Sequence, residues 1–137
     1  MTAPTYLLDA NVLIPLADLG NIDHQAANTW LGTTKRFATC PITEGALVRH
    51  VVRMGGRGQD AARLVGAIRS MAHATFWPDD VSYADVLLDD VYGHRQVTDS
   101  YLIALVRRHP GARLATFDRA LGLRAPDIVE LPELPEK

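Results

Sequence analysis

The sequence predicts an α/β fold, a three-layer α/β/α domain around a central, mostly parallel sheet of about five strands. Short apolar runs of strand length alternate along the chain with segments whose apolar residues recur at helical spacing. Glycine and proline punctuate many of the boundaries between them. Strands that alternate with helices are joined by crossovers, which make the strands parallel and place helices on both faces of the sheet.

Each predicted strand is a short apolar run bounded by turn-forming or polar residues. Pro41 follows the second strand and opens the next turn, and Pro78 stops the third. In chain order the strands cover residues 6–8, 36–39, 73–77, 113–116 and 128–129.

The best helix signal covers residues 99–108, where Thr98 is a suitable N-cap and Pro110 follows the end. In the helix predicted over residues 12–19, Pro15 is tolerable if it lies in the first turn, where amides lack partners. The other predicted helices cover residues 23–31, 43–54, a segment after Gly58 that runs to about 72, 83–88 and 118–121.

The chain has 137 residues, which is the length of one domain, so we expect a single domain over 1–137. The prolines of residues 131–137 predict an irregular tail. Cys40 is the only cysteine, which excludes an internal disulfide and a thiolate zinc cluster and favours a cytoplasmic location. No signal peptide or apolar stretch of transmembrane length is expected, so no membrane partner is predicted.

Four acidic residues are the most informative feature of the chain. Asp9, Glu44, Asp99 and Asp118 each lie where an apolar run gives way to a helix, or at the start of that helix. Such junctions gather in one crevice at the carboxyl edge of a parallel sheet. Two carboxylates about 5 Å apart repel by roughly 3 kcal/mol at an effective dielectric near 20, so the cluster requires a cation.

A site made of carboxylates selects Mg²⁺, or Mn²⁺ in its place, over zinc. Ions held by carboxylates with positions left open for a phosphate can activate a water and stabilise a leaving oxygen. The sequence therefore predicts a metal site for phosphodiester hydrolysis. Taken singly, Glu44 and Asp99 are also ordinary first-turn residues of helices, whereas Asp9 follows a buried strand and must be paired or ligated.

The four motifs resemble those of PIN-domain ribonucleases, in the order and approximate spacing of that family. They are Leu-Asp9-Ala-Asn11-Val-Leu-Ile, Thr-Glu44, Thr98-Asp99-Ser-Tyr-Leu-Ile-Ala-Leu and Thr116-Phe-Asp118-Arg119. The resemblance spans nearly the whole chain, and a lone domain of this size is similar to the VapC toxins of bacterial type II toxin–antitoxin pairs.

This resemblance implies a role for each acidic residue. Asp9, Asp99 and Asp118 would be metal ligands, direct or through water, and Glu44 would complete the catalytic site and position or deprotonate the attacking water. Side chains beside them would orient ligands or contact substrate; these are Asn11, Thr98, Thr116 and Arg119. For Thr98 the role of a helix cap is favoured, and Thr116 has the alternative role of a strand-end turn.

The resemblance also implies partners. They are an RNA substrate, a VapB-like antitoxin that covers the groove and inhibits the enzyme, and a second copy of the chain in a homodimer or a larger toxin–antitoxin complex. Twelve of the fourteen basic residues are arginines, because Lys35 and Lys137 are the only lysines, and arginine suits bidentate phosphate contacts. Five arginines are candidates for an RNA groove: Arg49, Arg53, Arg57, Arg95 and Arg119.

Two other functions remain open from the residues alone. An acidic groove could belong to a non-catalytic binding module that captures an arginine-bearing partner, or to a phosphatase-type metal-dependent phosphohydrolase. The haloacid-dehalogenase pattern needs a second aspartate where this chain has Asn11, and a mid-chain lysine that this chain lacks. Trp30 and Trp77 are expected to pack in the core and not to stack on bases.

Overall fold

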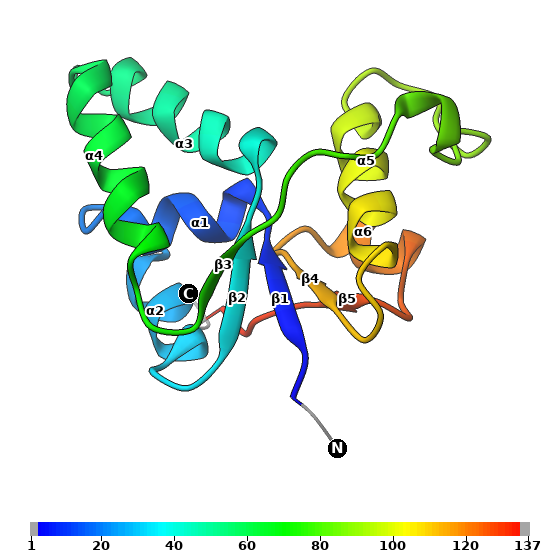
Figure 1. The fold of residues 1–137 in the computed structure, drawn as a ribbon, viewed down its shortest axis with the longest axis horizontal. Coiled ribbons are helices and arrows are strands. Elements are labelled where there is room, and N and C mark those ends of the chain that lie inside the picture. Colours follow the sequence, from blue (N-terminus) through cyan, green and yellow to red (C-terminus); the bar gives the residue numbers. More distant parts are fainter. Residues whose placement is uncertain (1–2, 135–137) are drawn as a thin grey trace.

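The computed structural model describes residues 3–134 of the chain. Its centre is a sheet of five strands in which every neighbouring pair is parallel (Figure 1). In sheet order the strands are β3 (Ala74–Phe76), β2 (Arg36–Thr39), β1 (Thr5–Leu8), β4 (Arg113–Ala115) and β5 (Val129–Glu130). The predicted parallel sheet is confirmed, and each strand lies within about two residues of its predicted place.

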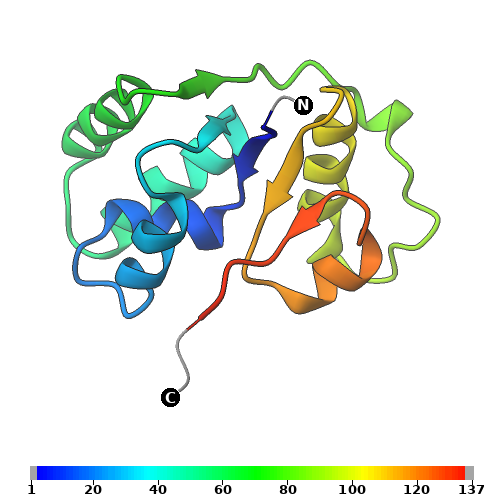
Figure 2. The same cartoon turned by 90° about the horizontal axis from the view of Figure 1, so that it is seen from below.

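Helices cover both faces of the sheet. One group is α1 (Ala10–Ala17), α2 (His24–Leu31), α3 (Pro41–Arg53) and α4 (Gly58–Arg69). The other group is α5 (Gln96–Arg107) and α6 (Arg119–Arg124), which lie on the opposite side in both views (Figures 1 and 2). This arrangement confirms the predicted three layers.

Two apolar clusters form the core, one on each face of the sheet. Alternation along the strands sends Leu7 and Leu114 into the cluster with α5 and α6, and Leu8 and Ala115 into the cluster with α1, α2 and α3. Strands buried on both faces are continuous apolar runs, which explains why they could be recognised in the sequence.

The order of the strands places a topological switch point between β1 and β4. From β1 the chain proceeds through α1 and α2 to β2 and then to β3 at one edge. After β3 it crosses to the other side of β1, where α5 leads into β4 (Figure 2). Ligands of open α/β sheets bind at such a point, outside the carboxyl ends of the strands.

The first helix begins two residues earlier than predicted, so Pro15 lies in its second turn and not in its first. There it removes an N–H that would have bonded to the Asn11 carbonyl. The Pro15 carbonyl at the helix end lies 2.8 Å from Nδ1 of His24. With the proton on Nδ1, this histidine satisfies one of the carbonyls that a helix end leaves without a partner.

Two further helix predictions were wrong in detail. Residues 83–88 contain only a short 3₁₀ turn, Tyr83–Asp85, inside a long connection from β3 to α5. Helix α5 starts at Gln96, so Thr98 is its third residue and does not cap it. Arg95 occupies the cap position without a side-chain hydrogen bond to the helix.

Residues 131–134 have no regular structure, as expected for the tail, and residues 135–137 lie outside the described residues. Glu133 and Leu134 line a pocket together with Trp30 and Ile22, so the tail reaches α2. Across residues 3–134, no helix combines the length and the apolar character that crossing a membrane requires.

We expect Leu8→Ala to lower the free energy of unfolding by about 2–5 kcal/mol, because it removes a fully buried side chain from the central strand. Urea denaturation measures the change. The matched control is Leu19→Ala, whose side chain is 80 % exposed and whose loss should cost less than about 0.5 kcal/mol. Equal losses for the two variants would contradict this account of the core.

Candidate active site

Asp9 lies at the carboxyl end of β1 and caps helix α1. Its Oδ1 accepts the N–H of Ala10 at 2.7 Å, and only 8 % of the residue is exposed. Burial raises the pKa of the Asp9 carboxyl, hydrogen bonds from Thr116 and Ala10 oppose that rise, and the charge of Asp118 adds to it. This is the buried, partnered carboxylate that its place after an apolar strand predicted.

The hydroxyl of Thr116 joins the ends of the two central strands. It lies 2.8 Å from Oδ2 of Asp9, and it accepts the N–H of Asp118 at 3.1 Å and the Nδ2 amide of Asn11 at 3.0 Å. A hydroxyl has one proton and two acceptor lone pairs, so these three bonds use its full capacity. Thr116 therefore orients Asp9.

Asn11 completes this network from the first turn of α1. Its Oδ1 accepts the N–H of Phe117 at 3.0 Å, while its Nδ2 donates to Thr116. The side chain thus connects the segment that follows β1 to the segment that follows β4, and it fixes the position of one relative to the other.

Asp118 is the N-cap of α6. Its Oδ1 accepts the N–H groups of Ala120 at 2.9 Å and Leu121 at 3.3 Å, and no hydrogen bond within residues 3–134 is made to its Oδ2. One oxygen is consequently used for structure and the other is left to face the site.

Asp99 lies in the first turn of α5, where the helix dipole favours a negative charge. Burial, followed by the charges of Asp9 and Asp118, raises the pKa of Asp99 to about 6. The three aspartates are therefore close enough to act on one another, although they are separated by up to 109 residues in the sequence. The fold thus brings these three aspartates together at the switch point, as the sequence predicted.

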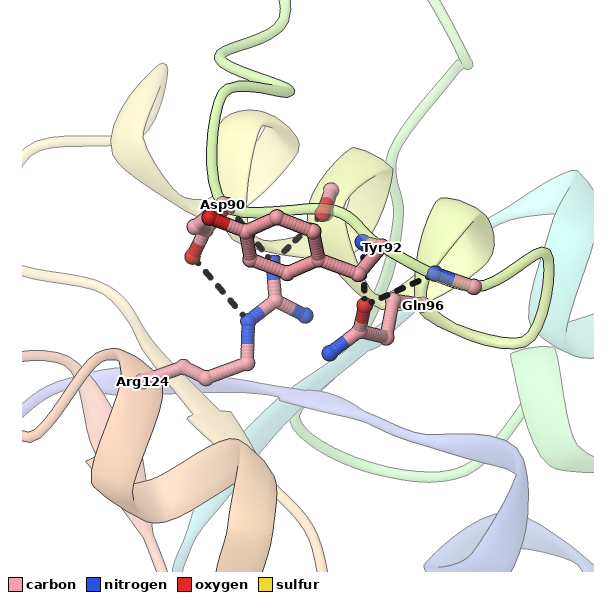
Figure 3. A network of polar contacts seen from close by, with 6 residues as sticks. Asp90, Tyr92, Gln96 and Arg124 are labelled. Carbon is pink, nitrogen blue, oxygen red and sulfur yellow. Dashed lines mark hydrogen bonds and ion pairs between the residues drawn. The ribbon is translucent and has the colours of Figure 1, made fainter.

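Sequence reasoning missed Arg124, whose positive charge acts on Asp99. The Arg124 guanidinium lowers the pKa of Asp99 and donates to Oγ of Ser100 at 2.7 Å and to both oxygens of Asp90 at 3.2 Å (Figure 3). Asp90 thus forms an ion pair with Arg124. Its partner is 34 residues away, and no local pattern in the sequence signals such a pair.

Glu44 occupies the first turn of α3, beside the end of β2. Its Oε2 accepts the hydroxyl proton of Thr39, the last residue of β2, at 2.8 Å. Glu44 is not among the charges that shift Asp9 or Asp99. The structure thus brings the three aspartates close to one another. Glu44 lies apart from them, at the carboxyl end of β2.

The donor set of Asp9, Asp99 and Asp118 consists only of carboxylate oxygens, the chemistry that Mg²⁺ and Mn²⁺ prefer. Burial is the main cause of the raised pKa values of Asp9 and Asp99, and repulsion among the three aspartates adds to it; a divalent cation would offset this second contribution. Within residues 3–134, no three or more His, Cys, Asp or Glu side chains stand at metal-binding distances from a common point. A bound ion would therefore have to draw the carboxylates closer than they stand in its absence.

The other sequence-predicted candidates are mostly at the surface. Thr98 is exposed and makes no side-chain hydrogen bond within the described part of the chain. The five candidate arginines are all exposed, and none forms an ion pair with a residue in the range 3–134: Arg49, Arg53, Arg57, Arg95 and Arg119. Trp77 is buried and stacks on His109 at 3.7 Å, and Trp30 packs edge-on against Tyr6 at 5.0 Å.

We expect Thr116→Val to lower the free energy of unfolding by about 1–3 kcal/mol, because the buried Asp9 carboxylate loses its hydroxyl donor. The change should also raise the pKa of Asp9 further. Urea denaturation measures the stability, and carbon-13 NMR of the aspartate carboxyls follows the titration. Thr116→Ser keeps the hydroxyl and is the control; a pKa of Asp9 that is equal in both variants would contradict the role given to the hydroxyl.

The titration of Asp99 predicts a pH-dependent stability in the absence of metal. The carboxyl binds its proton more tightly in the folded protein than in the unfolded chain, so stability falls as the pH rises from 3.8 to about 6. We expect Asp99→Asn to be more stable than the unchanged protein above that interval, and the difference to vanish below it. Urea denaturation in EDTA tests this.

The control for that experiment is Asp89→Asn, which changes an exposed aspartate that forms no ion pair with any residue of the described segment. If Asp99→Asn and Asp89→Asn followed the same pH profile, crowding of the three aspartates would not be the cause.

A PIN-domain family profile matches residues 6–125 of the chain. Among curated proteins, ribonuclease VapC29 of Mycobacterium tuberculosis is 46 % identical over 128 residues, which cover 93 % of this chain and 96 % of that protein. Ribonuclease VapC39 of the same species is 43 % identical over 129 residues, covering 85 % of this chain and 91 % of its own length.

Solved structures have the same fold. The crystal structure of Mycobacterium tuberculosis VapC20, a toxin that cleaves the sarcin–ricin loop, aligns with a TM-score of 0.69 and 18 % identity over 93 % of this chain and 99 % of its own. The VapBC2 structure from Rickettsia felis, bound to a DNA fragment from its promoter, aligns with a TM-score of 0.61 and 16 % identity. The alignment covers 94 % of this chain and 99 % of that chain. The chain thus belongs to the PIN-domain family, and it is a VapC-like ribonuclease, a hydrolase of phosphodiester bonds.

Proposed function

We propose that this ribonuclease is a Mg²⁺-dependent endoribonuclease, with Mn²⁺ as a possible substitute, and that it acts as the toxin of a toxin–antitoxin pair. The observation that carries the catalytic part is the placement of Asp9 before α1, Asp99 in the first turn of α5 and Asp118 before α6, at the switch point of the sheet, where their charges act on one another. Such coupling suits a cluster that holds a cation, and it is costly for one that does not.

In this proposal Asp9, Asp99 and Asp118 hold the metal, directly or through water. When bound, Mg²⁺ supplies charge neutralisation and an acidic water for attack on phosphorus. Thr116 and Asn11 keep the Asp9 carboxylate oriented from behind, as partners of ligands do in metal sites. Asp118 remains fixed through the two amides of α6 that its other oxygen accepts.

Glu44 is proposed as the group that positions or deprotonates the attacking water. Its hydrogen bond to Thr39 leaves one carboxylate oxygen, Oε1, without a partner in the described residues. Arg119 follows Asp118 directly and is exposed, so we assign it to a backbone phosphate of the RNA. Thr98, one residue before Asp99 and also exposed, is proposed to contact the substrate.

The regulatory part of the proposal rests on likeness to the VapC relatives and to the VapBC2 structure. A VapB-like antitoxin would occupy the acidic groove with an extended segment and a basic side chain, so that binding and inhibition are one event. The chain would assemble as a homodimer or within a larger toxin–antitoxin complex, in the cytoplasm where its RNA is found.

The test is cleavage of total bacterial RNA by the antitoxin-free protein in Mg²⁺, in EDTA, and after Asp9→Asn or Asp118→Asn. Asparagine keeps the capping oxygen at both positions, so the fold should survive. We expect discrete fragments only with metal and both aspartates, and a loss of at least about 100-fold in each variant. Cleavage that continued in EDTA would overturn the metal-dependent mechanism.

A further inference from the structure

Residues 90–93 form a loop, between the 3₁₀ turn and α5, that is fixed at both of its ends. At one end Asp90 receives two hydrogen bonds from Arg124 of α6, each 3.2 Å long (Figure 3). The Arg124 side chain is only 16 % exposed, so this ion pair is shielded on the arginine side. Partly buried pairs of this bidentate kind hold their geometry better than surface pairs.

At the other end the loop is bound to the first residue of α5. Oε1 of Gln96 accepts the main-chain N–H of Tyr92 at 2.8 Å and that of Gly93 at 3.2 Å, and the Gln96 N–H donates to the Gly93 carbonyl at 3.0 Å. The backbone on which Tyr92 stands is thus held by three hydrogen bonds to one residue.

Although its backbone is held in this way, the side chain of Tyr92 is not packed into the protein. It is 92 % exposed, more than any other large hydrophobic side chain in the described part of the chain. In the view of Figure 3 its ring lies in front of the contacts between Asp90 and Arg124. A rigid backbone under an unpacked aromatic ring lowers the entropy cost of binding something to that ring.

The loop is attached to the same helix turn that carries an active-site aspartate. Gln96, Asp99 and Ser100 share one face of α5 because they are three and four residues apart. Arg124 binds Ser100 and Asp90, and its charge acts on Asp99. The exposed cation Arg95, which has no ion-pair partner in residues 3–134, follows on the same segment.

We propose that Tyr92 stacks on a nucleobase of the single-stranded RNA that flanks the scissile phosphodiester, while Arg95 contacts a phosphate beside it. An exposed aromatic ring and an exposed cation on the same short segment, here three residues apart, are the combination that single-stranded nucleic-acid sites use. Every base has a π-face, so the ring gives affinity and fixes the register of the strand relative to the cut without selecting a particular base. This assignment rests on the proposed endoribonuclease function.

The first test measures cleavage of a short single-stranded RNA that spans a cut site mapped from total RNA. We expect Tyr92→Ala to raise KM about tenfold, equivalent to about 1.4 kcal/mol, with kcat nearly unchanged, and Tyr92→Phe to behave like the unchanged protein. Leu19→Ala, which removes another exposed apolar side chain, is the matched control and should leave both constants unchanged.

The second test observes the stacking itself. The same RNA carries 2-aminopurine at one position at a time and is bound in EDTA to prevent cleavage. A single position should be quenched by the unchanged protein and by Tyr92→Phe, but not by Tyr92→Ala. An unchanged KM in Tyr92→Ala, or identical quenching by all three proteins, overturns the inference while leaving the nuclease intact.

Two further outcomes would also overturn it. If Tyr92→Ala altered self-association in light scattering, and KM returned to normal at higher protein concentration, the ring would belong to a protein interface. If the unchanged protein cut no RNA at all, the proposed function would fail first and the stacking role with it.

Discussion

The hydrogen bond from Thr116 to Asp9 is the interaction on which the geometry of the site depends. The two residues follow adjacent parallel strands, and the bond fixes the carboxylate that follows β1 against the segment that follows β4. Because the same hydroxyl accepts the amide of Asp118, a single oxygen positions two of the three coupled aspartates. These hydrogen bonds hold the buried Asp9 side of the site in place before any ligand arrives.

Burial and repulsion make the ionised form of Asp99 unfavourable, and the other groups of the protein compensate for this only in part. Burial and mutual repulsion raise the pKa of Asp99 to about 6, and Arg124 offsets only part of this effect. Arg124 is itself bound to Asp90 and Ser100, so its charge is shared among several acceptors. If the proposed metal site is right, the protein trades stability in the absence of metal for affinity in its presence, a compromise that is common where function needs crowded like charges.

Much of this could be predicted from the sequence, for a physical reason. Parallel strands buried on both faces must be continuous apolar runs, and groups that follow them must meet at one edge, so the fold and the grouping of Asp9, Asp99 and Asp118 follow from local patterns. What could not be predicted depends on distant contacts. Helix α5 begins at Gln96 and not after Thr98, because the Gln96 side chain engages the preceding loop and the loop is held in turn by Arg124. Similarly, no local pattern signals the hydrogen bond by which Thr39 at the end of β2 holds Glu44 in the first turn of α3.

The crossing of the chain after β3 divides the four proposed catalytic residues evenly between two halves of the sequence. Asp9 and Glu44 belong to the segment that builds β1, β2, β3 and the first four helices, while Asp99 and Asp118 belong to the segment that builds α5, β4, α6 and β5. The seam between the halves is the pairing of β1 with β4. A chain cut in the connection from Phe76 to Gln96 would give two fragments that each carry two of the four proposed catalytic residues. RNA cleavage by a mixture of the two fragments would then report their reassembly.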